Sequence, residues 1–291
     1  MYKAITLVLL QFLAASTSLL QAEVNTTRSV SFGDSLTDND YLFLIFDNDP
    51  FLYQADPFER MFQKAASQGD VLENYAVLGS ESQHVLQQVR QYVSARSAGQ
   101  LPPATLLSLE AGGNDFLNEA KLFQLANYPP GANEAADEIV NSIRQNLMQS
   151  VRLLRQVDDA PVVLWTIPDV TQVPVSYLYG FSPDQLSNLR LHVARINQFL
   201  RHQTKRKDLV LMDMAEVLNM ATYSPPVIME QIIYPAPLVG SPTYIFADPI
   251  HPTAVANGIL ANEMIQSLNK KLADDIPLYS EEELGTMAGI N

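Results

Sequence analysis

Short apolar runs recur along the chain and predict the strands of a sheet. They lie at residues 28–32, 71–77, 104–109, 161–167 and 208–212. Each run is rich in β-branched or aliphatic residues and is followed by glycine, proline or small polar residues, which is typical of β-strands. The run at 161–167 is apolar almost throughout, and this pattern indicates a parallel strand buried on both faces. We therefore expect a parallel sheet of about five strands.

Between these runs, apolar residues recur three or four positions apart, which is the spacing of one face of a helix. We expect helices at residues 82–98, 138–157, 183–205 and 253–272. Ser182 and Pro183 supply a cap and a first-turn proline for the third of these helices. Strands that alternate with helices predict a single α/β domain, flavodoxin-like, with three α/β/α layers.

Two segments do not fit this alternation. Residues 223–244 are apolar and rich in proline without a regular period, so they either cover the site or form an excursion that does not contact substrate. Residues 273–291 form an acidic C-terminal tail with weak signals of order. Neither segment indicates a second domain.

Composition and charge exclude several classes of protein. The 291 residues are 47% hydrophobic, which is enough for one large core, and the net charge is −14. Nucleic-acid binding depends on cations that neutralise phosphates, so this balance argues against a nucleic-acid partner. It also disfavours adsorption to anionic membranes, although the simplest consequence of the charge is solubility.

The N-terminus resembles an export signal. Lys3 is followed by an apolar run to about Ala15, and small and polar residues then lead to Ala22. We expect residues 1–22 to be a signal peptide cleaved near Ala22, with a signal anchor or a buried helix as alternatives. The chain has no cysteine, so no disulfide or lipid-modified cysteine is available. Export without disulfides suits a secreted or periplasmic bacterial protein with no stable membrane insertion after cleavage.

The strand at residues 28–32 stops at Gly33-Asp34-Ser35, a small polar turn that presents a serine. Reacting groups of open α/β sheets lie at the carboxyl ends of strands, where the following backbone N–H groups stabilise negative charge. Ser35 is therefore the candidate nucleophile. A serine hydroxyl needs a base to remove its proton, and the base needs a carboxylate to orient it.

Four histidines are available as that base. His84, His192 and His202 lie in helical stretches with charged neighbours, where we expect solvated or half-buried surface side chains. His251 lies between two prolines and three residues after Asp248. Asp248 can hydrogen-bond one ring nitrogen from this spacing and leave the other nitrogen for Ser35.

Four sequence blocks together resemble the GDSL branch of the SGNH hydrolases. They are Gly33-Asp34-Ser35-Leu36, Asn74-Tyr75-Ala76-Val77-Leu78-Gly79, Gly112-Gly113-Asn114-Asp115 and Asp248-Pro249-Ile250-His251 with Pro252-Thr253. They occur in the order typical of that family. The resemblance implies one SGNH hydrolase domain over residues 23–272 and the activity of a GDSL esterase or lipase.

The resemblance also implies a role for each matched residue. Ser35 is the nucleophile, His251 the base and Asp248 the residue that orients it. The oxyanion donors are the backbone N–H groups of Ser35 and Gly79 and the side-chain amide of Asn114. A glycine amide can approach substrate without a Cβ, and a neutral amide donates without acting as a base. The chain has no His-Glu-x-x-His signature and no glycine-rich phosphate loop, so we expect no metal and no cofactor.

The substrate is less well defined than the reaction. Residues 41–46 are apolar where the family usually has small polar residues, so Phe43 and Phe46 are expected to bind an acyl chain or a lipid surface, or else to pack against the sheet. We expect a small-molecule or lipid carboxylic ester, as for a lipase or phospholipase. A carbohydrate O-acetylesterase and a non-catalytic binding protein with the same fold are the alternatives.

Overall fold

The protein is described by a computed structural model that covers residues 24–38, 49 and 51–290. Its centre is a five-stranded parallel sheet in the order β2-β1-β3-β4-β5. The strands are β1 (Arg28–Phe32), β2 (Val71–Asn74), β3 (Leu106–Leu109), β4 (Val162–Trp165) and β5 (Leu209–Met212). The predicted α/β fold with a parallel sheet of five strands is confirmed.

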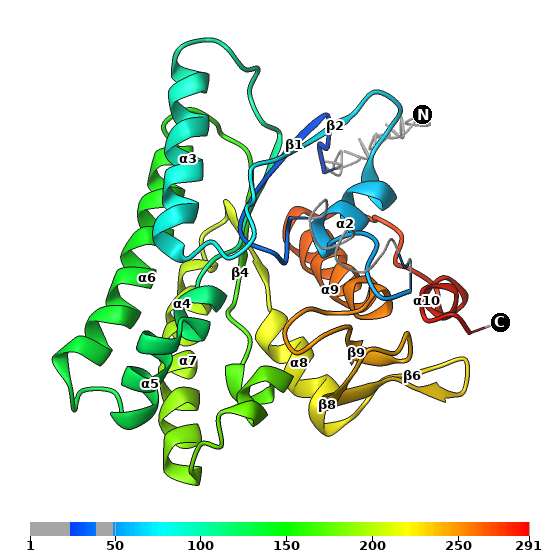
Figure 1. Ribbon diagram of the computed structural model, residues 1–291. Helices are drawn as coiled ribbons and strands as arrows, with labels where there is room; N and C mark the ends of the chain where they lie inside the picture. The colour runs from blue at the N-terminus through cyan, green and yellow to red at the C-terminus, as the bar shows by residue number, and fades with distance from the viewer. Residues whose placement is uncertain (1–23, 39–48, 50, 291) are drawn as a thin grey trace, which may run out of the picture.

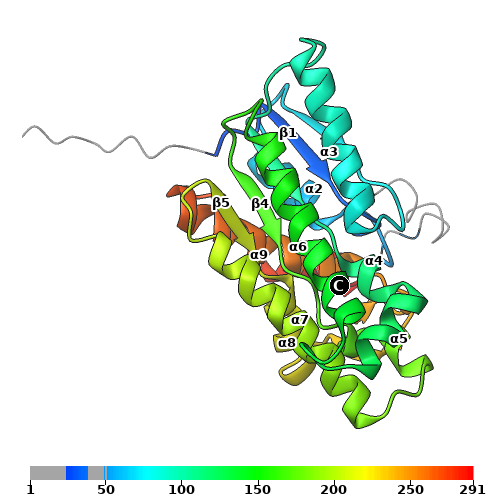
Figure 2. The ribbon, with the colours of Figure 1, turned by 90° about the vertical axis from the view of Figure 1, so that its left-hand side faces the viewer.

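Helices cover both faces of the sheet (Figures 1 and 2). One face carries α3 (Ser82–Ser97), α6 (Glu134–Leu154) and α7 (Pro183–Gln203), and the other carries α2 (Pro57–Ala65) and α9 (Ala254–Leu272). Successive strand residues point to opposite faces, and both faces are buried here. This arrangement explains why β4 and β5 are apolar without alternation.

The remaining helices are short. They are α4 (Gly113–Leu117), α5 (Glu119–Asn127), α8 (Met214–Tyr223), α10 (Glu281–Met287) and the 3₁₀ turns η1 (Val170–Gln172) and η2 (Pro174–Leu178). The predicted cap of α7 is present, since the Ser182 hydroxyl accepts a hydrogen bond from the Gln185 N–H. Among the described residues, no helix is both long and apolar enough to cross a membrane.

Residues 223–244 contain short strands rather than a large irregular loop. β6 (Val227–Ile228) pairs with β7 (Gln231–Ile232), and β8 (Tyr234–Val239) pairs with β9 (Tyr244–Phe246). They form two small sheets beside α8, seen in yellow and orange in Figure 1.

The acidic C-terminal segment differs from the expected weakly ordered tail. Ser280 caps α10 in a reciprocal capping box, which satisfies N–H groups of its first turn. The helix packs against α9 at Gly258, where a Cβ would lie 2.7 Å from both Leu284 Cδ2 and Met287 Sδ. Close helix contact at Gly258, local capping and the apolar side chains of α10 therefore order this segment.

The strand order places a crevice at the carboxyl ends of β1 and β3. The chain goes from β1 to its neighbour β2 and then returns past β1 to form β3, so the connections diverge at this point. Open α/β sheets bind ligands at such a point. Phe32 at the end of β1 pairs with Leu109 at the end of β3. The segments that follow, beginning with Gly33 and Glu110, therefore leave the sheet side by side.

Candidate active site

The turn that carries Ser35 is held by its own backbone and by Asp34. The Thr37 N–H donates to the Asp34 carbonyl at 3.1 Å, and the Leu36 N–H donates to the Asp34 carboxylate at 3.0 Å. At Gly33, a Cβ would lie 2.2 Å from Thr37 Oγ1, so a side chain there would displace the turn. The glycine of the first sequence block is therefore required by close packing.

Two side chains from neighbouring elements fix this turn from outside. Gln88 of α3 accepts from the Gly33 N–H at 3.0 Å and donates to the Gly33 carbonyl at 2.9 Å. Asn74, the last residue of β2, donates to the Thr37 carbonyl and accepts from the Ala76 N–H. The second contact turns the chain after Asn74 and ends β2 three residues before the predicted boundary at Val77.

His251 and Asp248 lie in the loop between β9 and α9, and this loop meets the Ser35 turn. His251 Nε2 is 2.9 Å from Ser35 Oγ, although the two residues are 216 positions apart. His251 Nδ1 is 2.7 Å from Asp248 Oδ2. Asp248 Oδ1 also accepts from the backbone N–H groups of Ile250 and His251. The structure thus brings together the three residues that the sequence predicts as a catalytic triad.

The contacts of Asp248 indicate which atoms of the triad carry protons. Burial raises the pKa of Asp248, but hydrogen bonds and charge attraction from His251, with the two backbone donors, outweigh it and the net pKa is lowered. An ionised carboxylate can only accept, so His251 Nδ1 carries the proton and Nε2 offers its lone pair to the Ser35 hydroxyl.

The predicted oxyanion donors lie around the same point. Asn114 Nδ2 donates to Asp34 Oδ2 at 2.7 Å and to the Ser80 carbonyl at 3.2 Å. Asn114 thus contacts the residue before Ser35 and the residue after Gly79, which brings all three predicted donors to one place. Among the described residues, neither the Ser35 nor the Gly79 backbone N–H has an acceptor.

Gly79 adopts a backbone conformation that favours glycine. Its φ is +73°, in the left-handed region, and no protein atom lies within 4 Å of where a Cβ would be. That its amide approaches substrate without a Cβ stays a prediction.

Glu110, which follows β3, is a buried acid that the sequence analysis missed. Its carboxylate accepts from the Asp34 N–H at 3.1 Å. Burial and the nearby charge of Asp34 raise the pKa of Glu110 well above its usual value. Burial also raises the pKa of Asp34, but hydrogen bonds from Leu36 and Asn114 favour its charged form. Glu110 is therefore the member of the pair that holds its proton more tightly. The sequence does contain one signal that could have revealed Glu110. It is a single carboxylate between an apolar strand and Gly112-Gly113.

Asp115 connects the loop after β3 to neighbouring elements. It accepts from the Ser82 N–H at 2.6 Å at the start of α3 and lies 3.1 Å from Lys121 Nζ.

The expectation for His192 is corrected, because this residue is completely buried in α7 and not a surface side chain. Its Nε2 lies 2.8 Å from the Tyr128 carbonyl, and burial lowers its pKa. His84 and His202 are exposed, as expected.

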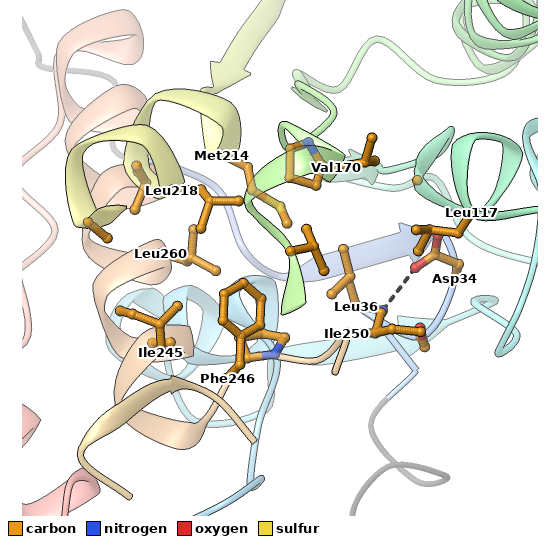
Figure 3. A pocket seen from close by; sticks show the side chains of 18 of the residues that line it. Asp34, Leu36, Leu117, Val170, Met214, Leu218, Ile245, Phe246, Ile250 and Leu260 are labelled. Atoms are coloured by element: carbon orange, nitrogen blue, oxygen red, sulfur yellow. Dashed lines mark hydrogen bonds between the residues drawn. The ribbon is translucent and has the colours of Figure 1, made fainter. Parts of the chain in front are cut away.

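An apolar pocket opens beside Ser35 (Figure 3). Its walls come from the segment after β4, from α8, from β9 and from the first turns of α9. No described residue of 223–244 lines it, which favours the interpretation of that segment as a structural excursion. Phe43 and Phe46 lie outside the described residues, so their role stays a prediction.

No group of three or more His, Asp or Glu side chains that could hold a metal ion occurs in the described part of the chain. The expectation that no metal or cofactor is needed stays a prediction.

Comparison with known proteins assigns the class. The sequence profile of the family described as GDSL-like Lipase/Acylhydrolase matches residues 30–264. This match covers most of the chain, and the protein belongs to that family, as its four sequence blocks predict. Family membership implies hydrolase activity on esters. No curated protein sequence matches the chain significantly.

Solved structures share the fold at low sequence identity. The lipase Lip_vut3 from a goat rumen metagenome aligns with a TM-score of 0.55 and 13% identity, over 83% of this chain and 97% of that chain. A protein described as a GDSL-like lipase from Parabacteroides merdae aligns with a TM-score of 0.51 and 12% identity, over 84% and 98% of the two chains. At this identity the likeness establishes the fold alone.

Proposed function

We propose that this protein is a serine hydrolase of lipid-like carboxylic esters that works through an acyl-enzyme. The observation that carries the proposal is the hydrogen-bonded chain from Ser35 through His251 to Asp248. A nucleophile, a base and an orienting carboxylate in this geometry are the parts that serine acyl transfer needs.

The reaction proceeds in two steps. Ser35 Oγ attacks the ester carbonyl carbon while His251 Nε2 takes the hydroxyl proton. The tetrahedral intermediate then expels the alcohol, which receives that proton from His251, and the acyl group stays on Ser35. Water next attacks the acyl-enzyme with His251 again as the base. The ester bond to Ser35 then breaks, His251 returns the proton to Ser35 Oγ, and the acid is released. Asp248 stabilises the imidazolium in both steps.

The oxyanion is held by the backbone N–H groups of Ser35 and Gly79, which have no acceptor among the described residues, and by Asn114. Both N–H bonds of the Asn114 amide now have acceptors, Asp34 and the Ser80 carbonyl. One of them must leave its acceptor to reach the oxyanion. The longer bond, to Ser80, is the one we expect to be exchanged.

The apolar pocket beside Ser35 favours a lipid-like substrate over the alternatives. An acetyl group on a carbohydrate would leave most of the pocket empty. A binding protein without activity would have no need for a histidine aligned on a serine. The substrate is therefore a small-molecule or lipid ester.

We further propose that the protein acts outside the cytoplasm, after removal of residues 1–22. This part rests on the sequence pattern alone, with its short apolar run and small residues up to Ala22.

Ser35→Ala tests the mechanism. We expect turnover of p-nitrophenyl butyrate to fall by roughly 10⁶, because the nucleophile is removed. The melting temperature should change little, and a fluorophosphonate probe should label the wild type but not the variant. Ser142→Ala, on the surface of α6, is the matched control and should keep full activity. Turnover at the wild-type rate in Ser35→Ala would refute a serine mechanism.

A further inference from the structure

The pocket beside Ser35 is polar at one end and apolar along the rest of its length. Asp34, Ser35 and Asn114 line the polar end. In Figure 3, Leu218 and Ile245 lie at the end away from Asp34, with Met214 between the two ends. The pocket contains about 790 Å³ of space free of protein atoms, its open mouth included.

Apolar walls that face solvent instead of protein are costly. They forfeit apolar burial and the dispersion contacts that a close-packed interior supplies. Larger side chains at the two buried alanines of the wall, Ala221 and Ala256, would reduce the space. The cavity is therefore better explained by an apolar ligand than by imperfect packing.

Helix α8 gives the pocket a direction. Met214, Leu218 and Ala221 are spaced four and three residues apart, so they form one stripe along the helix. Met214 directly follows Asp213 and β5, at the edge of the sheet where Ser35 also lies. At 1.5 Å per residue, Ala221 lies about 10 Å further along the helix axis than Met214. The stripe thus extends away from the nucleophile.

The position of His251 decides which part of an ester enters the pocket. The leaving alcohol must lie within reach of His251 Nε2, which returns the proton to it. Among the described residues that line the pocket are Ser35 and Asn114 but not His251. The part of the substrate that stays on Ser35 therefore occupies the pocket.

We propose that the pocket holds the acyl chain of the substrate and that Leu218, Ala221 and Ile245 at its far end limit the length of that chain. This inference rests on the proposed ester hydrolase function. The enzyme then selects esters by the length of the acid, while the alcohol lies outside the pocket.

The test compares two substrate series on two opposite variants. The first series varies the acid, from p-nitrophenyl acetate through butyrate and octanoate to palmitate. The second varies the alcohol, from ethyl acetate to octyl acetate. Ala221→Phe shortens the pocket, and Leu218→Ala lengthens it.

We expect Ala221→Phe to lower kcat/KM for octanoate esters by roughly 10–200-fold, while kcat/KM for acetate esters changes little. Adding or removing one methylene group in a hydrophobic pocket changes kcat/KM by about this factor. Leu218→Ala should move the preferred acid toward palmitate. Met220→Phe is the matched control, because it adds the same ring at the next position on the half-exposed side of α8, and it should leave both series unchanged. Melting temperatures show whether each variant folds.

Each contrary result has a separate meaning. If Ala221→Phe lowers activity on octyl acetate but not on octanoate, the pocket holds the alcohol and the inference is wrong. It is equally wrong if both variants fold and neither changes the preferred chain length. If the folded wild type hydrolyses no ester of either series, the proposed function itself fails. Binding of octanoate to Ser35→Ala, measured by calorimetry and weakened by Ala221→Phe, would then still support an acyl pocket.

Discussion

The two ends of the pocket are built from different kinds of contact. At the polar end, His251 has a partner at each ring nitrogen, and Asp248 accepts three hydrogen bonds. At the far end, Leu218 and Ile245 are buried in apolar surroundings with no directional bond from their side chains. Hydrogen bonds depend on angle and distance, whereas apolar contacts depend on volume and shape.

This difference predicts how each end responds to substitution. A change of one atom at the polar end removes a directional bond and should lower the rate for every ester. A change at the far end alters space, so it should change which ester is preferred. Two substitutions around the polar end test this separation, and a third, at the buried Glu110 beside Asp34, tests a proton held next to it.

Asp248→Asn should have the largest effect. The amide keeps the size of the side chain but stabilises the wrong tautomer of His251, so we expect kcat to fall by about 10⁴. Acetate and octanoate esters should lose activity by the same factor. Asp275→Asn, an exposed substitution of the same kind, is the control. A loss confined to octanoate would contradict the separation of the two ends.

Asn114→Ala should have a smaller effect. Removal of one oxyanion donor costs about 10²–10³ in kcat, with KM little changed. The proportion between acetate and octanoate rates should again be preserved. Asn127→Ala, at the exposed end of α5, should be neutral apart from its surface hydrogen bond to Gln185. An unchanged kcat in folded Asn114→Ala would assign the residue to structure alone.

Glu110→Gln should have the smallest effect on rate and is best followed by stability. The raised pKa keeps the Glu110 carboxyl protonated in the folded protein when the unfolded chain has already released that proton. The unfolded state then binds fewer protons, so wild-type stability falls as pH rises above about 4.3, the value for an exposed glutamate, until the folded pKa is passed. Glutamine resembles the protonated acid and does not titrate, so the variant should not show this fall of stability with rising pH.

Thermal melts of both proteins between pH 4 and pH 9 provide the measurement. We expect the melting temperature of Glu110→Gln minus that of the wild type to increase as pH rises, with the smallest difference near pH 4. Glu119→Gln at the exposed start of α5 is the control. Parallel melting curves at every pH would show that Glu110 is ionised in the folded protein.

The same contrast explains what could be predicted from the sequence. Ser35, Asp248 and His251 stood out because directional chemistry requires particular residue types at particular spacings, and the structure brings them together. The sheet was predictable because strands buried on two faces must be apolar on both sides. The far end of the pocket was not, because Leu218 and Ala221 have the same helical spacing as ordinary core residues.

Glu110 and α10 escaped prediction for another reason. The state of Glu110 depends on the buried Asp34, which is distant in sequence, and the docking of α10 depends on the absence of a side chain at Gly258. Both depend on contacts between remote segments, which neither local propensity nor periodicity records.

The position of His251 late in the chain bears on the order in which the protein is made. Ser35 is synthesised 216 residues before His251, and α9 and α10 follow still later. A domain generally folds as a unit, so the serine and its base come together only when the whole sheet and its last helices form. A chain that ends before residue 248 has the serine but neither the proposed base nor its carboxylate. Such truncated chains should therefore lack the proposed activity.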